Sequence, residues 1–171
     1  NGEGNKDIGA PVLAGQGSDY LNRQLHYFRN HIRGGNDGDI YGRQMLPFAA
    51  ILSNDEAVAN ISRYLNSLAP VTATTSTEHR GNAVVGRELY KNCAVCHGEF
   101  AQGHYAQKAP KLAGQYSWYL KRQIENYQRG IRGKHPQDMY GSQMILMSKL
   151  LQNEQAIDDV LAYIATLKPA K

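Results

Sequence analysis

The sequence predicts an all-α protein in which one domain occurs twice in tandem. Three observations lead to this prediction. Apolar residues recur at helical spacing in several segments, no segment alternates like a half-buried strand, and the chain matches itself at a fixed offset. The 171 residues, 42% of them apolar, suffice for one ordinary globular domain or two small ones.

The internal match has an offset of 99 residues. Residues 10–70 align with residues 109–169 without a gap, and 25 of these 61 positions are identical. Chance would give only a handful of identities, so we infer a duplicated domain. Between the copies lies a threonine-rich stretch with few apolar residues, which is typical of a linker. We expect a first domain at 1–70, a linker at 71–82 and a second domain at 83–171.

The apolar spacing also predicts individual helices. In the first domain, apolar side chains share one helical face over residues 54–68. For the second domain we expect helices at 83–92, 116–129, 154–167 and, as a short helix, 144–151, with long loops at 98–115 and 130–143.

Both cysteines of the chain lie in the run Cys93-Ala94-Val95-Cys96-His97, which is the attachment pattern of c-type haem. Two thiols at this spacing can add to the two vinyl groups on one edge of a porphyrin, and the adjacent His97 then supplies an imidazole nitrogen to the iron. We therefore predict one haem c, covalently bound through Cys93 and Cys96.

Two other uses of the cysteines are weaker alternatives. A redox-active cysteine pair would follow a strand in a parallel sheet, whereas a helix is expected before this motif. A closed zinc site needs a further ligand, for which His79, His104 and His135 are the loose candidates.

A methionine is the expected second axial ligand, because its sulfur raises the potential of a c-type haem. The candidates are Met45, Met139, Met144 and Met147. Met144 alone among those in the second copy aligns with a methionine, Met45, at the offset of 99 residues. We predict that Met144 binds the iron of the second domain, and that Met45 does so in the first domain only if a haem is present there. We also expect Tyr140 to contact the cofactor.

The first copy begins just after the place where its own attachment motif would lie. Subtracting 99 from 93, 96 and 97 gives −6, −3 and −2, which precede Asn1. We expect the first domain to be N-terminally incomplete, with its first helix and haem motif absent from the supplied chain. A haem-free remnant is the alternative. No signal peptide is expected within the chain, because its first residues lack a basic region and an apolar region.

The chain resembles the dihaem cytochrome c4 family of class I cytochromes c over nearly its whole length. In the second domain the residues that carry the resemblance are 86–90, 93–98, Gly103, 110–115, Tyr119, Gln123, Met144 and Leu151. In the first domain they are Gly4, Pro11, 13–16, Tyr20, Gln24, Met45 and Leu52.

The resemblance implies two tandem class I cytochrome c domains that face each other, with the haem propionates near the interface. It implies that the carbonyl of Pro110 accepts a hydrogen bond from Nδ1 of His97. It also implies that Gly86 and Tyr90 lie where the first and last helices of the second domain cross, with Tyr163 opposite.

Electron transfer is the expected function, because an iron with two protein ligands has no open position for a substrate. The chain is then not an enzyme by itself. The resemblance implies a periplasmic protein that exchanges electrons with quinol-oxidising complexes, terminal oxidases or reductases. A cytochrome subunit of a dehydrogenase is the main alternative, and a haem sensor in which Met144 leaves the iron is a weaker one.

Composition narrows the possible partners. The net charge is +4, and no run of basic residues is interleaved with aromatic ones, so binding to nucleic acid is not expected. No apolar run approaches the ~20 residues that span a bilayer. Association with a membrane surface or with an enzyme subunit stays open.

Overall fold

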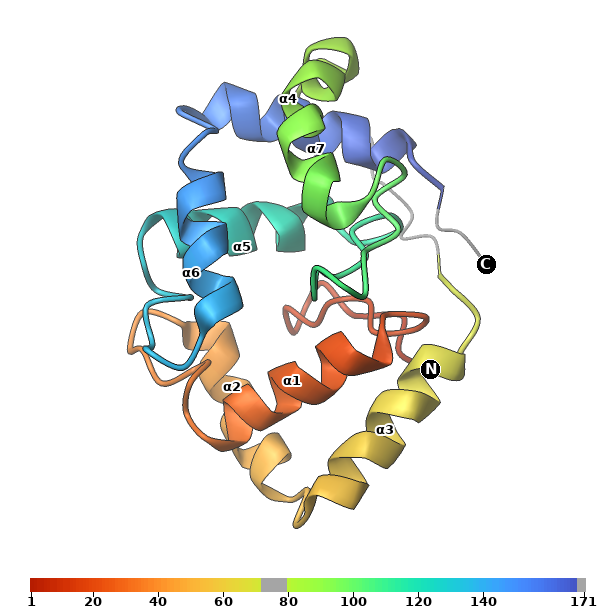
Figure 1. The fold of residues 1–171 in the computed structure, drawn as a ribbon, viewed down its shortest axis with the longest axis vertical. Coiled ribbons are helices and arrows are strands. Elements are labelled where there is room, and N and C mark those ends of the chain that lie inside the picture. The colour runs from red at the N-terminus through yellow and green to blue at the C-terminus, as the bar shows by residue number, and fades with distance from the viewer. Residues whose placement is uncertain (72–79, 169–171) are drawn as a thin grey trace.

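The computed structural model describes residues 1–71 and 80–168, and their regular structure is helical (Figure 1). The helices are α1 (Ser18–Arg29), α2 (Ile40–Ala50), α3 (Asp55–Ser67), α4 (Ala83–His97), α5 (Ser117–Gln128), α6 (Met139–Ser148) and α7 (Glu154–Thr166). Within the described residues the only strand-like pairings are two isolated bridges, Asn5 with Ala10 and His104 with Ala109. The all-α prediction is confirmed.

The two halves of the chain repeat the same helices. The bounds of α5 and α7 are those of α1 and α3 shifted by 99 residues. Both α2 and α6 begin after a buried aspartate, and the side chains of Asp39 and Asp138 accept hydrogen bonds from the backbone N–H of Gly42 and Gly141. In the first copy α1 packs against α2 and α3, and in the second α5 packs against α6 and α7.

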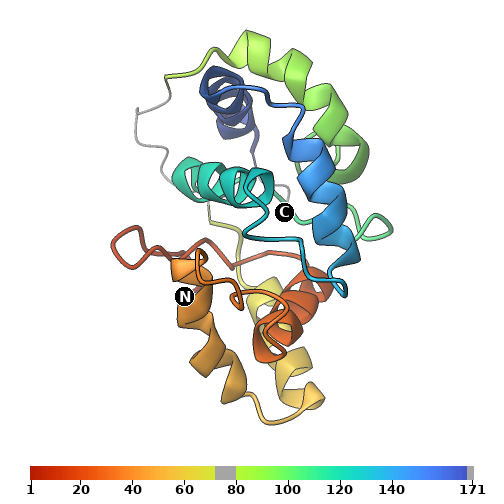
Figure 2. The ribbon, with the colours of Figure 1, turned by 90° about the vertical axis from the view of Figure 1, so that its left-hand side faces the viewer.

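The copies meet across an interface with approximate two-fold symmetry, with the first copy below the second in Figure 2. The Gln115 side chain accepts a hydrogen bond from Val12 N at 2.9 Å and donates one to Val12 O at 2.8 Å. In the same way, the side chain of Gln16 binds both backbone groups of Lys111, each at 2.9 Å. These reciprocal pairs hold the two copies in one register.

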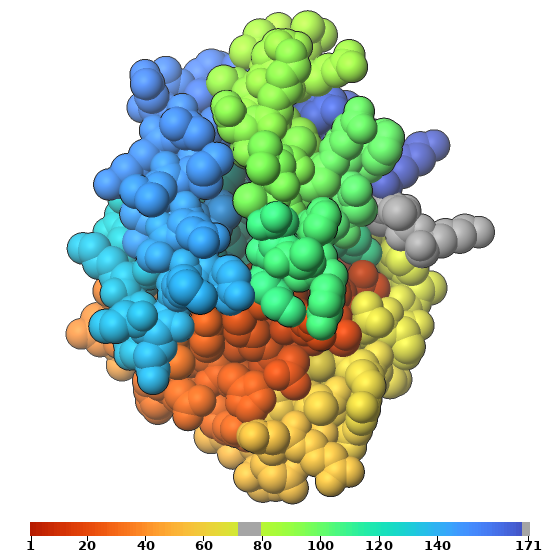
Figure 3. Space-filling view, in the orientation of Figure 1, coloured from red at the N-terminus to blue at the C-terminus, as the bar shows by residue number. Residues whose placement is uncertain are grey.

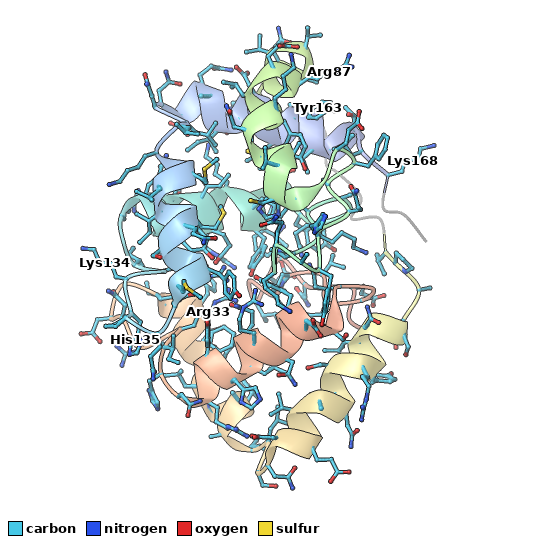
Figure 4. The ribbon with its side chains drawn as sticks, viewed as in Figure 1. Arg33, Arg87, Lys134, His135, Tyr163 and Lys168 are labelled. Atoms are coloured by element: carbon cyan, nitrogen blue, oxygen red, sulfur yellow. The ribbon has the colours of Figure 1, made fainter. Side chains whose placement is uncertain are left out.

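The main core lies in the second copy, where α4 crosses α7. The crossing depends on Gly86, because a Cβ there would lie 1.9 Å from the carbonyl oxygen of Asp159. Close approach lets the rings of Tyr90 and Tyr163 pack with centroids 5.4 Å apart. Figure 4 labels Tyr163 where α7 passes α4. This arrangement matches what the resemblance implied for Gly86, Tyr90 and Tyr163.

The expected helices at 54–68, 116–129 and 154–167 are confirmed to within one residue at each end. Two other expectations were wrong. The helix expected at 83–92 continues to His97 and ends before Gly98, which has φ +82°. The helix expected at 144–151 runs from Met139 to Ser148. The loop expected at 130–143 therefore ends at Asp138, whose side chain caps the N-terminus of α6.

The linker predicted at 71–82 falls mostly on residues 72–79, which lie outside the described residues. The domain limits at 70 and 83 therefore stay a prediction. Within the described ranges, no helix combines the length and the apolar character that crossing a membrane requires.

Candidate haem site

One pocket of the second copy collects the residues that the sequence singled out. It lies between α4, α5 and α6, and Figure 3 shows the surface hollowed between α6 and the segment formed by α4 and its following loop. Its lining includes Cys93, Cys96, His97, Pro110, Tyr140 and Met144. The six site residues predicted for the second domain therefore share one cavity.

The last turns of α4 carry both cysteines and the histidine. Residues three and four apart share one face of a helix, so Cys93, Cys96 and His97 all face the pocket. The two cysteines are not joined to each other in a disulfide. Burial, and then the neighbouring Cys96, raises the pKa of the Cys93 thiol to about 11.

His97 is held in one orientation. The ring is 6% exposed, and its Nδ1 lies 2.9 Å from the carbonyl oxygen of Pro110. A carbonyl oxygen can only accept a hydrogen bond, so Nδ1 carries the ring proton and donates a hydrogen bond to the Pro110 carbonyl. This leaves the unprotonated Nε2 as the atom that can bind a metal. Burial lowers the pKa of His97, although the bond to Pro110 opposes this shift. The neutral ring that results is the form that binds a metal.

Helix α6 supplies the opposite wall. Met144 and Met147, three residues apart on the helix, both line the pocket, as does Tyr140. Met45, the counterpart of Met144 in α2, is half-buried and does not line this pocket. By position, both Met144 and Met147 of α6 could therefore offer a thioether sulfur to a metal in this pocket.

The pocket fits a haem c. Two thiols, an imidazole and a thioether sulfur are the donors that a c-type haem uses. Around them the walls are apolar and include Leu112, Leu120, Ile124, Leu151, Val160 and Ile164. The structure gives less support to the two alternatives, a zinc site and a redox-active cysteine pair. Neither His104 nor His135 lines the pocket, His79 lies outside the described residues, and the raised pKa of Cys93 is the opposite of what a redox-active thiol needs.

Sequence reasoning missed part of this pocket, because first-copy residues also line it. Tyr20, Arg23 and Gln24 of α1 contribute to the walls, together with Arg132 of the second copy. Their signal was present in the internal repeat, where Arg23-Gln24 and Arg122-Gln123 are identical pairs. Identity alone did not show that one copy reaches into the pocket of the other.

Comparison with known proteins identifies the family. Residues 83–168 match the model of the cytochrome c family. The chain belongs to the cytochrome c family. Membership brings the covalently bound haem c for which Cys93 and Cys96 are present, and the predicted resemblance to cytochrome c4 is confirmed by the relatives that follow.

Among curated relatives, cytochrome c-552 of Acidithiobacillus ferridurans is 30% identical over 167 residues, which cover 92% of this chain and 66% of that protein. The chain thus spans slightly less than two thirds of this relative's length. A solved cytochrome c4 of Acidithiobacillus ferrooxidans has a TM-score of 0.73 and 27% identity, and the match covers 92% of this chain and 89% of that one. Thiosulfate dehydrogenase TsdBA of Marichromatium purpuratum also has a TM-score of 0.73, with 29% identity, and the match covers 96% of this chain and 34% of that one.

Proposed function

We propose that this protein carries single electrons on a haem c bound by Cys93 and Cys96, with His97 and Met144 as the axial ligands. The observation that supports this most is that His97 and Met144 line the same pocket. With a protein ligand on each axial face, the site takes up and releases an electron but has no open position for a substrate.

The residues around the pocket suit this function. The haem iron, when bound, supplies a one-electron couple. Pro110 fixes the ring of His97, so the imidazole does not rotate when the charge of the site changes. The apolar walls exclude water, which reduces the solvent rearrangement that each electron transfer requires.

A spectroscopic and redox measurement tests the proposal. The pyridine haemochrome spectrum should show one thioether-linked haem on this chain, and titration should show one reversible one-electron step. Both oxidation states should be low-spin and six-coordinate. A five-coordinate, high-spin ferric spectrum at neutral pH, or rapid binding of carbon monoxide by the ferrous form, would contradict the proposal and favour a haem sensor.

The resemblance to cytochrome c4 supports a wider role. We place the protein in the bacterial periplasm, where it exchanges electrons with quinol-oxidising complexes, terminal oxidases or reductases. We retain domain limits of 1–70, 71–82 and 83–171, with Met45 as an axial ligand if the first copy also binds haem. Cell fractionation against a periplasmic marker and reduction by a quinol-oxidising membrane fraction test this part.

A second candidate is the cytochrome part of a dehydrogenase. The structural match to TsdBA favours this candidate, because it covers 96% of this chain but only 34% of the TsdBA chain. A protein of this size could therefore be one part of a larger enzyme. Purification from the native source distinguishes the two candidates. Stable copurification with a catalytic subunit supports the second, whereas a free cytochrome that exchanges electrons by collision supports the first.

A further inference from the structure

A series of hydrogen bonds joins His97, in the second copy, to a residue of the first copy. His97 Nδ1 donates to the carbonyl oxygen of Pro110 at 2.9 Å. That carbonyl belongs to the same peptide group as the N–H of Lys111, and this N–H donates to Oε1 of Gln16 at 2.9 Å. Figure 1 shows the loop before α1 beside the loop that follows α4. One peptide group therefore lies between His97 and Gln16, with a hydrogen bond on each side.

The side-chain amide of Gln16 has one defined orientation. Its Oε1 also accepts a hydrogen bond from the N–H of Gly17 at 3.0 Å, and its Nε2 donates to the carbonyl oxygen of Lys111 at 2.9 Å. Exchange of the two amide atoms would break all three hydrogen bonds, because both partners of Oε1 are donors and the partner of Nε2 is an acceptor. Gln16 is only 6% exposed, and its own carbonyl accepts a hydrogen bond from the side chain of Asn66 on α3.

Hydrogen bonds on the two sides of a peptide group strengthen each other. When the N–H of a peptide donates, electron density shifts toward the carbonyl oxygen, which becomes a better acceptor. Gln16 therefore strengthens the hydrogen bond that Pro110 accepts from His97. An imidazole that donates more strongly from Nδ1 is more basic at Nε2 and binds a metal more strongly. The oxidised iron carries more positive charge and gains more from this basicity, so the series of hydrogen bonds favours the oxidised state.

We propose that Gln16 of the first copy is a positioning residue for His97. Acting through the peptide group that follows Pro110, it fixes the imidazole ring, strengthens the Nδ1 hydrogen bond and lowers the reduction potential of the bound haem. The interface between the copies then does more than hold them in one register, because it also sets a property of the iron site. This inference rests on the proposed function.

The internal repeat provides a matched control in Gln115, the counterpart of Gln16. Gln115 Oε1 accepts from the N–H of Val12 at 2.9 Å and from that of Tyr116 at 3.0 Å, and its Nε2 donates to Val12 O at 2.8 Å. These are the same three bonds, but the peptide group that they reach follows Pro11. Among the described residues, no histidine ring donates to the carbonyl of Pro11.

The substitutions Q16M and Q115M remove the same interface bonds, since methionine resembles glutamine in length but offers no amide. Both glutamines also line the pocket, so the loss of a polar group beside the haem is common to the two variants. Only Q16M interrupts the series of hydrogen bonds to His97. The sign of the effect separates the two roles: a loosened interface admits water, which stabilises the oxidised state and lowers the potential, whereas a weaker Nδ1 hydrogen bond raises it.

The experiment is a redox titration of the haem-loaded wild type, Q16M and Q115M. We expect Q16M to raise the equilibrium constant for reduction of the haem about threefold, which is ~28 mV for one electron because a tenfold change is about 59 mV. Q115M should not raise it. In the proton–nitrogen NMR spectrum of the reduced protein, the Nδ1 proton of His97 should move upfield and exchange faster with water in Q16M, and Q115M should show neither change.

A potential that falls or stays constant in Q16M, an equal rise in both variants, or an unmoved His97 signal would overturn the inference. If Q16M does not fold with haem, Q16N is compared with Q115N, because the shorter amide stays polar but does not reach the other loop. The rise and the NMR shift should then occur in Q16N alone, and their absence would overturn the inference. A wild type without a reversible one-electron couple would contradict the proposed function itself, whereas a normal couple that Q16M leaves unchanged contradicts only this inference.

Discussion

The last helices of the two copies have the same length and place in the repeat, but they are buried differently. In the second copy α7 lies under α4, and Ile157, Val160, Leu161 and Ile164 belong to the largest core of the described residues. In the first copy no described helix crosses α3 in this way, and Tyr64, the counterpart of the packed Tyr163, is 56% exposed. An amphipathic pattern thus determines which face of a helix can be buried. Whether that face is buried depends on a second helix that packs against it.

The matching methionines of the two copies, Met144 and Met45, also have different surroundings. Met144 lines a pocket that the last turns of α4 also line, whereas Met45 does not line it. The recurring methionine therefore has one setting that can bind iron and one that lacks the matching histidine within the chain. Substitutions at paired positions can test how far this difference extends.

The largest effect is expected from Met144→Ala, with Met45→Ala as its counterpart. Loss of the axial sulfur should abolish the six-coordinate spectrum and lower the potential by on the order of 100 mV, within the roughly 0.8 V range that axial ligands span. Met45→Ala should leave the haem on Cys93 and Cys96 unchanged. Optical spectra and redox titration measure both. If both variants lost the six-coordinate spectrum, Met45 would also affect the haem on Cys93 and Cys96, which would contradict the expected difference between the copies.

A large loss of stability is expected from Gly86→Ala, which affects a helix crossing that, among the described residues, only the second copy has. The added Cβ would clash with the carbonyl oxygen of Asp159 and push α4 from α7. We expect a cost of about 2–3 kcal/mol, in the range of overpacked cores. Thermal unfolding measures it, and Val84→Ala on the same helix, where the side chain is 78% exposed, should change stability by less than about 0.5 kcal/mol.

A moderate effect is expected from Tyr163→Ala compared with Tyr64→Ala. Removing Tyr163 loses the ring contact with Tyr90 and the burial between α4 and α7, for about 2 kcal/mol in total. Tyr64→Ala removes a mostly exposed ring and should cost less than about 0.5 kcal/mol. Urea unfolding measures the difference. Equal costs would mean that the exposed face of α3 is covered in solution.

The smallest effect is expected from Lys121→Met, whose first-copy counterpart is the uncharged Asn22. Hydrogen bonds to Asp158 at 2.8 Å and Glu154 at 2.7 Å raise the pKa of Lys121 above its ordinary value of 10.5. The pairs are partly exposed, so we expect a loss of about 0.5 kcal/mol at pH 7.

The pH dependence has a defined sign. A lysine with a raised pKa in the folded state contributes its full stabilisation below pH 10.5, and the contribution falls as the pH rises through the raised value. The stability difference between wild type and Lys121→Met should therefore shrink above that pH. Asn22→Met should show no such trend, and a difference that is constant with pH would argue against the ion pairs.

Helices with strong amphipathic patterns could be predicted from the sequence, and those that depend on other features could not. The bounds of α5 and α7 followed from apolar spacing. Helix α6 was placed too late, since Gly141, Ser142 and Gln143 interrupt the apolar pattern in its first half and the capping by Asp138 was not recognised. Helix α4 was expected to end at residue 92, before the haem motif, whereas a continuous helix to His97 is what brings Cys93, Cys96 and His97 to one face.

The sequence by itself determined the duplication, the helical class, the resemblance to a family and the cysteine and histidine spacing that predicts a haem. These properties are written in short-range patterns: a spacing of two cysteines and a histidine, a helical period, and an identity at a constant offset. Only the tertiary structure decided that Tyr20, Arg23 and Gln24 of one copy line the pocket of the other, and which of two matching helices is buried. Such contacts join residues far apart in the chain, and they depend on how complete surfaces pack together, which no local pattern records.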